Sequence, residues 1–142
     1  PSWSSAASDV YKRQIQIIAA ILGTLFANYI FGLNVIEISS NIRSGANIYI
    51  SEFFAATGLL LVILLSRADG KNVVSFNVGI YITAALIFTS STSFANPAVT
   101  IARMFTESFT GINPSTVIFF ISCQVIGMFA AYILYKQFFK SK

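Results

Sequence analysis

The sequence has no histidine, a single cysteine and only 10% charged residues among its 142 positions. Without histidine the chain cannot build a Ser-His-Asp triad or a histidine metal site, which excludes most hydrolytic enzymes. Cys123 has no second cysteine with which to form a disulfide or a zinc site. We therefore expect no enzyme activity, no metal and no cofactor. A soluble domain carries about 25% charged residues, so this chain lacks the polar surface to cover itself in water.

Apolar residues are abundant instead, at 56% of the chain, and they gather in four long runs. Such runs predict an all-α membrane protein with four transmembrane helices, at about 15–32, 48–65, 73–88 and 114–139. In the first run, Gln16, Ala19 and Gly23 recur at helical spacing, a stripe that predicts contact with a neighbouring helix. Gln16 is expected among the structural buried polar residues, either donating to a neighbouring backbone or without a special role.

The two ends of the chain differ from the apolar part. Residues 1–14 are polar and Ser-rich, and we expect a tail foreign to the domain, either translated adapter sequence or a disordered native segment. Residues 140–142 are expected to form a cytoplasmic tail. The domain itself is therefore predicted at 15–139.

A helix-starting signal lies between the third and fourth runs. Asn96 can cap a helix with its side-chain oxygen, and Pro97 suits the first helical position, where no N–H is missed. The predicted helix runs over about 97–109, before the glycine stop at Gly111. At ~1.5 Å per residue it reaches only about 20 Å, short of the ~30 Å hydrocarbon core. We expect a re-entrant half-helix whose amino end points into a polar pathway.

Two further polar residues of the apolar runs are candidate buried braces. Glu52 sits about one turn inside the second run, where an acid is costly unless it finds donors in protein. We expect its carboxylate to accept from backbone N–H groups of a non-helical segment; the alternative is a first-turn glutamate that snorkels to the surface. Gln124 lies in the middle of the fourth run and is expected to be a second structural brace.

The positive charges predict the orientation of the spans. With a cytoplasmic amino end, seven Lys and Arg residues fall inside, whereas only Arg43 and Arg103 fall outside. The carboxyl end is then cytoplasmic. The net charge of +4 reflects this topology, and no nucleic-acid partner is expected because no basic patch is interleaved with exposed aromatics.

Asn96-Pro97-Ala98, placed after a third run and before a fourth, resembles the pore motif of the aquaporin and glycerol-facilitator (major intrinsic protein) family. The resemblance extends to three further patterns: Gln16 with Ala19 and Gly23 in that family's third span, Ser51-Glu52-Phe53 in its fourth, and Gln124 with Gly127 in its sixth. The chain thus resembles the part from third to sixth span. The loop before Asn96 is most similar to a bacterial branch with arsenical-resistance associations. The family's first half has no counterpart here, so a truncated fragment is expected.

The resemblance implies a selectivity constriction at Ala84, Ser93, Val99 and Arg103. Water and glycerol channels usually have an arginine directly after the motif, where this chain has Val99. Arg103, one turn further along, either supplies the constriction's charge or is a surface or interface residue. The small side chains of Ala84 and Ser93 imply a wider, less water-selective opening.

The implied function is passive permeation of water and/or small uncharged solutes, either glycerol-like or neutral metalloid hydroxides. The expected setting is the bacterial inner membrane, with the lipid bilayer as partner and a homotetramer as the assembly of the full-length parent. Two alternatives remain open: a fragment of a secondary transporter with a discontinuous helix, and a non-conducting membrane subunit.

Overall fold

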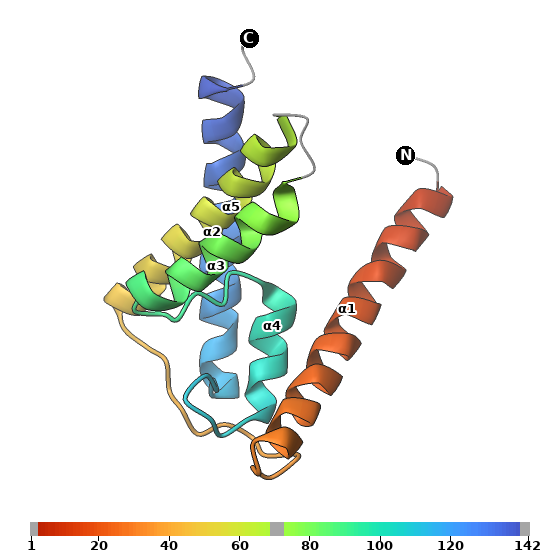
Figure 1. Cartoon of the computed structure of the whole chain (residues 1–142), viewed down its shortest axis with the longest axis vertical. Helices are drawn as coiled ribbons and strands as arrows, with labels where there is room; N and C mark the ends of the chain where they lie inside the picture. Colours follow the sequence, from red (N-terminus) through yellow and green to blue (C-terminus); the bar gives the residue numbers. More distant parts are fainter. Residues whose placement is uncertain (1–2, 69–72, 140–142) are drawn as a thin grey trace. The chain divides into compact units, whose positions relative to one another are not determined.

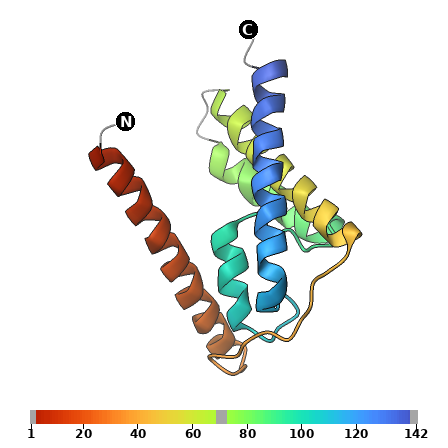
Figure 2. The same ribbon diagram turned by 180° about the vertical axis from the view of Figure 1, so that it is seen from behind.

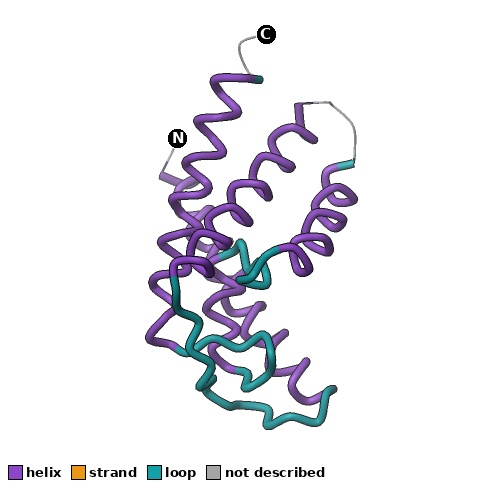
Figure 3. Tube along the Cα trace, turned by 90° about the vertical axis from the view of Figure 1, so that its left-hand side faces the viewer, coloured by secondary structure: helices purple, strands orange, loops and turns teal. Residues whose placement is uncertain are grey.

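A computed structural model describes residues 3–68 and 73–139, with side chains from residue 8. The described residues form helices and loops, with no strand among them (Figure 3). The elements in chain order (Figure 1) are α1 (Trp3–Ile30), α2 (Ala46–Ala68), α3 (Val74–Phe88), α4 (Pro97–Ala102), the short 3-10 helix η1 (Arg103–Phe105) and α5 (Pro114–Phe138). The expected tail at 140–142 lies outside the described residues.

The chain divides into two compact units, which are described separately. The first comprises the residues up to Ile42 together with Ala98–Val117, and the second comprises Arg43–Pro97 together with the chain from Ile118 onward. The boundaries therefore fall in the connector before α2, inside α4 and inside α5.

Within the second unit, α2 lies beside α3 and is crossed by α5 (Figures 1 and 2). Tyr81 of α3 donates its hydroxyl to the carbonyl of Ala55 at 3.0 Å, and Thr57 donates to the carbonyl of Gly127 at 3.1 Å. At Gly127 an added Cβ would lie 2.5 Å from the carbonyl oxygen of Phe53. Small residues therefore allow α2 and α5 to approach at backbone distance, as helices in membranes often do.

Within the first unit, Asn28 ties the end of α1 to the segment after α4. Its side-chain amide donates to the carbonyl oxygens of Val35 at 3.2 Å and Phe105 at 2.8 Å, and the residue is 3% exposed. The connector after α1 pairs with the same segment, since the Ser39 N–H donates to the carbonyl of Met104 at 2.9 Å. The η1 segment is thus held by α1 and by the connector.

The half-helix is shorter than the sequence predicts. It starts at Pro97 as expected but ends at Phe105 rather than at 109, and Thr106 is already extended, with φ −144°. The reason is that donors outside the helix bond its last carbonyl oxygens. The Ile112 N–H donates to the carbonyl of Arg103 at 3.1 Å. The Ser39 N–H donates to the carbonyl of Met104, and the Asn28 side-chain amide donates to that of Phe105. With those acceptors occupied, the chain turns away at Thr106.

The amino-terminal segment also differs from expectation. α1 begins at Trp3, so the described part of the expected tail is helical and not disordered. No proline or glycine interrupts residues 3–14, and Lys12 lies 4.0 Å from Asp9 in an i,i+3 ion pair. Nothing in this stretch terminates a helix, so α1 continues through it. The origin of residues 1–14 stays a prediction.

Two of the described helices are long and apolar enough to cross a membrane. They are α2, with 23 residues and a mean hydropathy of 2.2, and α5, with 25 residues and a mean hydropathy of 2.3. The apolar helix α3 has 15 residues. Large apolar side chains such as Phe54, Ile87 and Phe129 are 62%, 85% and 66% exposed, a surface suited to lipid. The full count of four spans stays a prediction.

Candidate functional site

The loop at 89–96, between α3 and α4, is the most constrained backbone of the second unit. Ser91, Phe94 and Ala95 are 0%, 4% and 7% exposed, although the loop has no regular secondary structure. Thr92, Ser93 and Ala95 have positive φ angles of 61°, 43° and 47°. Such conformations cost of order 1–3 kcal/mol each and persist only where surrounding contacts impose them.

Glu52 supplies the first of these contacts. Its carboxylate has no exposed surface and accepts from the N–H groups of Ala95 at 2.6 Å and Phe94 at 3.3 Å. Gln124, also fully buried, donates its side-chain amide to the same carboxylate at 2.7 Å. The structure therefore brings together Glu52 of α2, Gln124 of α5 and the irregular segment that the sequence associates with them. A snorkelling Glu52 does not fit this burial.

Arg43 contacts the same loop by donating hydrogen bonds to acceptor groups of the loop. Its Nη1 lies 3.3 Å from the carbonyl oxygen of Ser91 and 3.4 Å from the hydroxyl of Thr92, and its guanidinium lies 5.1 Å from the centre of the Phe94 ring. Burial lowers the pKa of Arg43, while the negative charge of Glu52 raises it. The loop backbone is thus held from two sides: the Glu52 carboxylate accepts from its N–H groups, and the Arg43 guanidinium donates to one of its carbonyls.

Sequence reasoning did not identify Arg43 as a site residue. The sequence marked Arg43 only as one of two positive charges expected on the outer side of the membrane. It lies in a polar connector that has no helical periodicity. Its 7% exposure depends on the connector returning to the loop 48 residues further along the chain. A single sequence gives no signal for such a contact.

Ser93, an expected constriction residue, is buried within this loop. Its N–H donates to the hydroxyl of Ser91 at 3.3 Å. Its own hydroxyl oxygen is buried and has no hydrogen-bond partner within residues 3–68 and 73–139. A buried hydroxyl is costly without a partner, so this oxygen is a candidate contact for a water or solute hydroxyl.

The motif residues follow the loop. Asn96 is exposed, Pro97 is the first residue of α4, and Ala98 is half-buried within that helix. Proline at this position loses no hydrogen bond, because the first N–H groups of a helix have no partner inside it.

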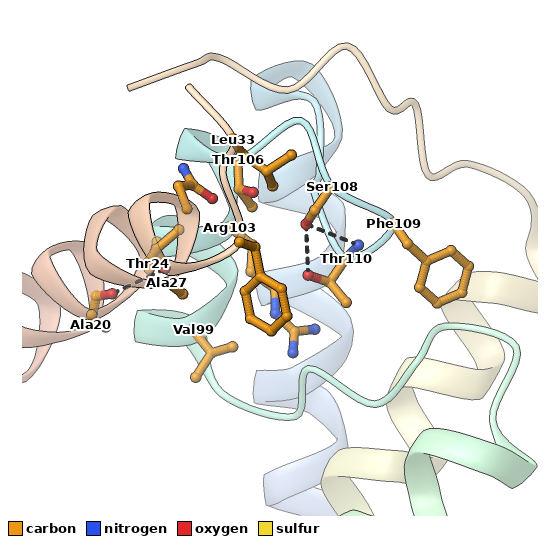
Figure 4. A pocket seen from close by; sticks show the side chains of 14 residues that line it. Ala20, Thr24, Ala27, Leu33, Val99, Arg103, Thr106, Ser108, Phe109 and Thr110 are labelled. Atoms are coloured by element: carbon orange, nitrogen blue, oxygen red, sulfur yellow. Dashed lines mark hydrogen bonds between the residues drawn. The ribbon is translucent and has the colours of Figure 1, made fainter. Parts of the chain in front are cut away.

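The first unit contains a cavity of about 760 Å³ between α1 and the segment from α4 onward (Figure 4). Val99 and Arg103 both line it, one helical turn apart, opposite Ala20, Thr24 and Ala27 of α1. The cavity lining is mainly apolar, with Arg103 as its charged member. A charged side chain in such surroundings is a functional candidate in a membrane protein.

Two further predicted site residues are exposed on their helices. Gln16, expected among the buried polar residues, is exposed on α1, because the part of its unit that covers α1 begins at Ala20. Ala84 is exposed on α3, where it lines a shallow groove with Gly79 and Thr83. The structure places Ala84 and Ser93 in one unit and Val99 and Arg103 in the other, so their meeting in one constriction stays a prediction.

A buried, irregular loop held by side chains of apolar helices, and leading into a short helix, is the kind of element found in membrane channels and transporters. The chain is 41% identical over 121 residues to aquaglyceroporin AqpS of Rhizobium meliloti (strain 1021). This similarity supports membership of the aquaporin and glycerol-facilitator (major intrinsic protein) family. The matched region covers 85% of this chain and 52% of that relative, so the chain spans about half the relative's length. No family model matches the chain. No solved structure matches it either.

Proposed function

We propose that this chain forms part of a channel for passive permeation of water and/or small uncharged solutes. The observation that carries the proposal is the loop at 89–96, whose N–H groups bond Glu52 although the loop belongs to an apolar helical unit. Irregular backbone at membrane depth is tolerated where protein surrounds it or where it lines a water-filled path. The similarity to an aquaglyceroporin supports the same interpretation.

In the proposed mechanism, Asn96 donates its amide hydrogens to the oxygen of a passing solute. The amino end of the half-helix carries partial positive charge, which opposes cations and interrupts proton transfer along a file of water. The buried Ser93 hydroxyl adds a second hydrogen-bonding group. Glu52 acts as a brace, because the loop and Gln124 engage its carboxylate.

The proposed permeants are glycerol-like molecules and neutral metalloid hydroxides in addition to water. This choice follows from Val99 in place of an arginine and from the small side chains at Ala84 and Ser93, which together leave a wide opening. The proposed setting is a homotetramer in the bacterial inner membrane with the carboxyl end in the cytoplasm.

A secondary transporter is the main alternative from another class. Carriers build their substrate sites from broken helices together with ion sites or paired charges. Glu52 is the only acidic residue in the four expected spans, and it is already hydrogen-bonded to the loop. The charges of the chain therefore favour a channel.

A chimera tests the proposal. The matched region of AqpS is replaced by residues 15–139 of this chain, and water and glycerol permeability of vesicles are measured by stopped-flow light scattering. We expect flux above that of empty vesicles without an ion gradient, and its loss in Asn96→Asp at equal protein density. Flux that saturates at low solute and requires an ion gradient would favour a carrier. Equal flux in the Asn96→Asp chimera would remove the motif from the pathway.

A further inference from the structure

The cavity of the first unit combines a mainly apolar lining with the charged side chain of Arg103 (Figure 4). It measures about 760 Å³ and lies between α1 and the segment from α4 onward. Volumes of roughly 300–1,000 Å³ are typical of sites that enclose a small organic molecule. Among the described residues that line the cavity, none is acidic. The lining is therefore complementary in charge to an anion.

We propose that this cavity is a binding site for an aliphatic monocarboxylate. The carboxylate pairs with the guanidinium of Arg103, and the carbon chain lies against the apolar part of the lining, which includes Ala20, Ala27, Leu33, Val99, Ala102 and Phe109. Such a site goes beyond the proposed permeation of neutral solutes and does not depend on it.

The chemistry of Arg103 favours a carboxylate over a neutral or a cationic head group. A guanidinium carries five N–H donors in a planar fork and no acceptor, so it matches the two oxygens of a carboxylate and repels an ammonium group. An alcohol offers one neutral oxygen in place of two charged ones. It should therefore bind more weakly than a carboxylate with the same carbon chain.

A pair of hydroxyl groups in the lining provides a further donor. Ser108 and Thr110 both line the cavity, and their hydroxyl oxygens lie 3.1 Å apart. Whichever of the two donates, the other hydroxyl keeps a hydrogen outside that bond. Thr24 differs, because its hydroxyl donates to the carbonyl of Ala20 within α1 at 3.1 Å. The Ser108 and Thr110 pair can therefore donate to a ligand in the cavity.

Gly23 of α1 opens onto the same space. It lines the cavity, and a Cβ added there would meet no described atom within 4 Å outside its chain neighbours and the nearby backbone of its own helix. A larger side chain at this position can enter the cavity without displacing its walls. Gly23→Leu therefore tests the space of the cavity separately from its charge.

The test measures the binding of three fluorinated probes that share one four-carbon chain: trifluorobutyrate, trifluorobutanol and trifluorobutylammonium. The full 142-residue chain is placed in phosphatidylcholine nanodiscs at neutral pH, and binding is followed by fluorine NMR against empty nanodiscs. We expect the carboxylate to bind on the order of tenfold more tightly than the alcohol, the gain from one further hydrogen bond between charged groups. The ammonium probe should not exceed the background of the empty nanodiscs.

Two variants separate the charge from the space. Arg103→Gln removes the charge, so the preference for the carboxylate over the alcohol should disappear, and Arg67→Gln, at the exposed end of α2, is the control for loss of one positive charge. Gly23→Leu should weaken the binding of both probes. Ala19→Leu, at an exposed position of the same helix outside the cavity lining, should leave both unchanged.

Equal affinity of the parent chain for the carboxylate and the alcohol would overturn the proposal, and this comparison holds even if Arg103→Gln fails to fold. A carboxylate preference that survives in folded Arg103→Gln would overturn it as well. Unchanged binding in Gly23→Leu would place the probes outside the cavity and refute the site.

The carboxylate titration is repeated on the chimera, in which AqpS supplies the rest of the channel. Loss of binding there would show that the added part fills the cavity, and would overturn the proposal for the assembled protein. Every readout is binding and not flux, so a failure of this proposal is distinguishable from a failure of the proposed permeation.

Discussion

Replacing Glu52 is the most direct test of how the loop is held. Glu52→Leu leaves three donors without their acceptor, namely the N–H groups of Phe94 and Ala95 and the amide of Gln124. Each buried donor left unpaired costs about 1–3 kcal/mol, which gives roughly 3–9 kcal/mol in total. Hydrogen bonds in membrane proteins average only about 0.6 kcal/mol, so the lower end of that range is expected. Glu52→Gln keeps one acceptor and should cost about 1–2 kcal/mol.

The assay is unfolding of the purified chain in mixed micelles with increasing dodecyl sulfate, followed by circular dichroism. The control is the same Glu-to-Leu change at Glu37, whose carboxylate accepts from Asn34 at an exposed site. We expect the stability order native, Glu37→Leu, Glu52→Gln and Glu52→Leu, with the first two nearly equal. If Glu52→Leu unfolded at the same detergent fraction as Glu37→Leu, the bracing role would be refuted.

Four further results are expected. Gly127→Ala should destabilise the second unit by about 1–3 kcal/mol, because the new methyl would meet the α2 backbone. Gly79→Ala is the control, since an added Cβ there has nothing within 4 Å and should not destabilise the unit. Thermal unfolding in detergent compares the two variants. The hydrogen bonds from Ser40 lower the pKa of Glu107 below its usual 4.5. The ionised Glu107 therefore stabilises the fold above pH 4.5, and this stabilisation is lost as the pH falls through the lowered pKa. Glu107→Gln should remove this acid dependence from unfolding curves. In the chimera, Arg103→Ala should raise the leak of larger solutes if Arg103 lines the path, and unchanged flux and selectivity would assign it to packing. Finally, this 142-residue chain alone should insert into vesicles without raising their water permeability, because its sequence holds one Asn-Pro-Ala half-helix and the resemblance implies that a pore needs two.

The apolar runs and the motif made much of the helical organisation predictable. The runs at 48–65, 73–88 and 114–139 correspond closely to α2, α3 and α5, because long apolar segments with no proline after their first residue have few alternatives to helix in a membrane. The start of the half-helix at Pro97 followed from local capping chemistry alone. Glu52 could be singled out because an isolated acid in an apolar run must find donors.

The features that were not predictable depend on contacts between distant residues. The half-helix ends at Phe105 because Ser39 and Asn28 reach its carbonyls, and neither contact follows from local sequence. The burial of Arg43 arises in the same way, through a loop far along the chain. Gln16 lies on a face of α1 that the described unit does not cover, so the packing predicted from its helical spacing stays a prediction.

The bracing of the loop at 89–96 has a consequence for the order in which the protein is made. The loop contacts Glu52 across 42 and 43 residues, whereas Gln124 lies 72 residues after Glu52. Glu52 therefore leaves the ribosome before the loop, and Gln124 leaves it later. The loop can therefore pair with Glu52 before α5 emerges, because both partners precede that helix in the chain. Until α5 has been inserted, however, the buried carboxylate lacks its third donor, the Gln124 amide, so insertion of the last helix completes the hydrogen bonds of this acid.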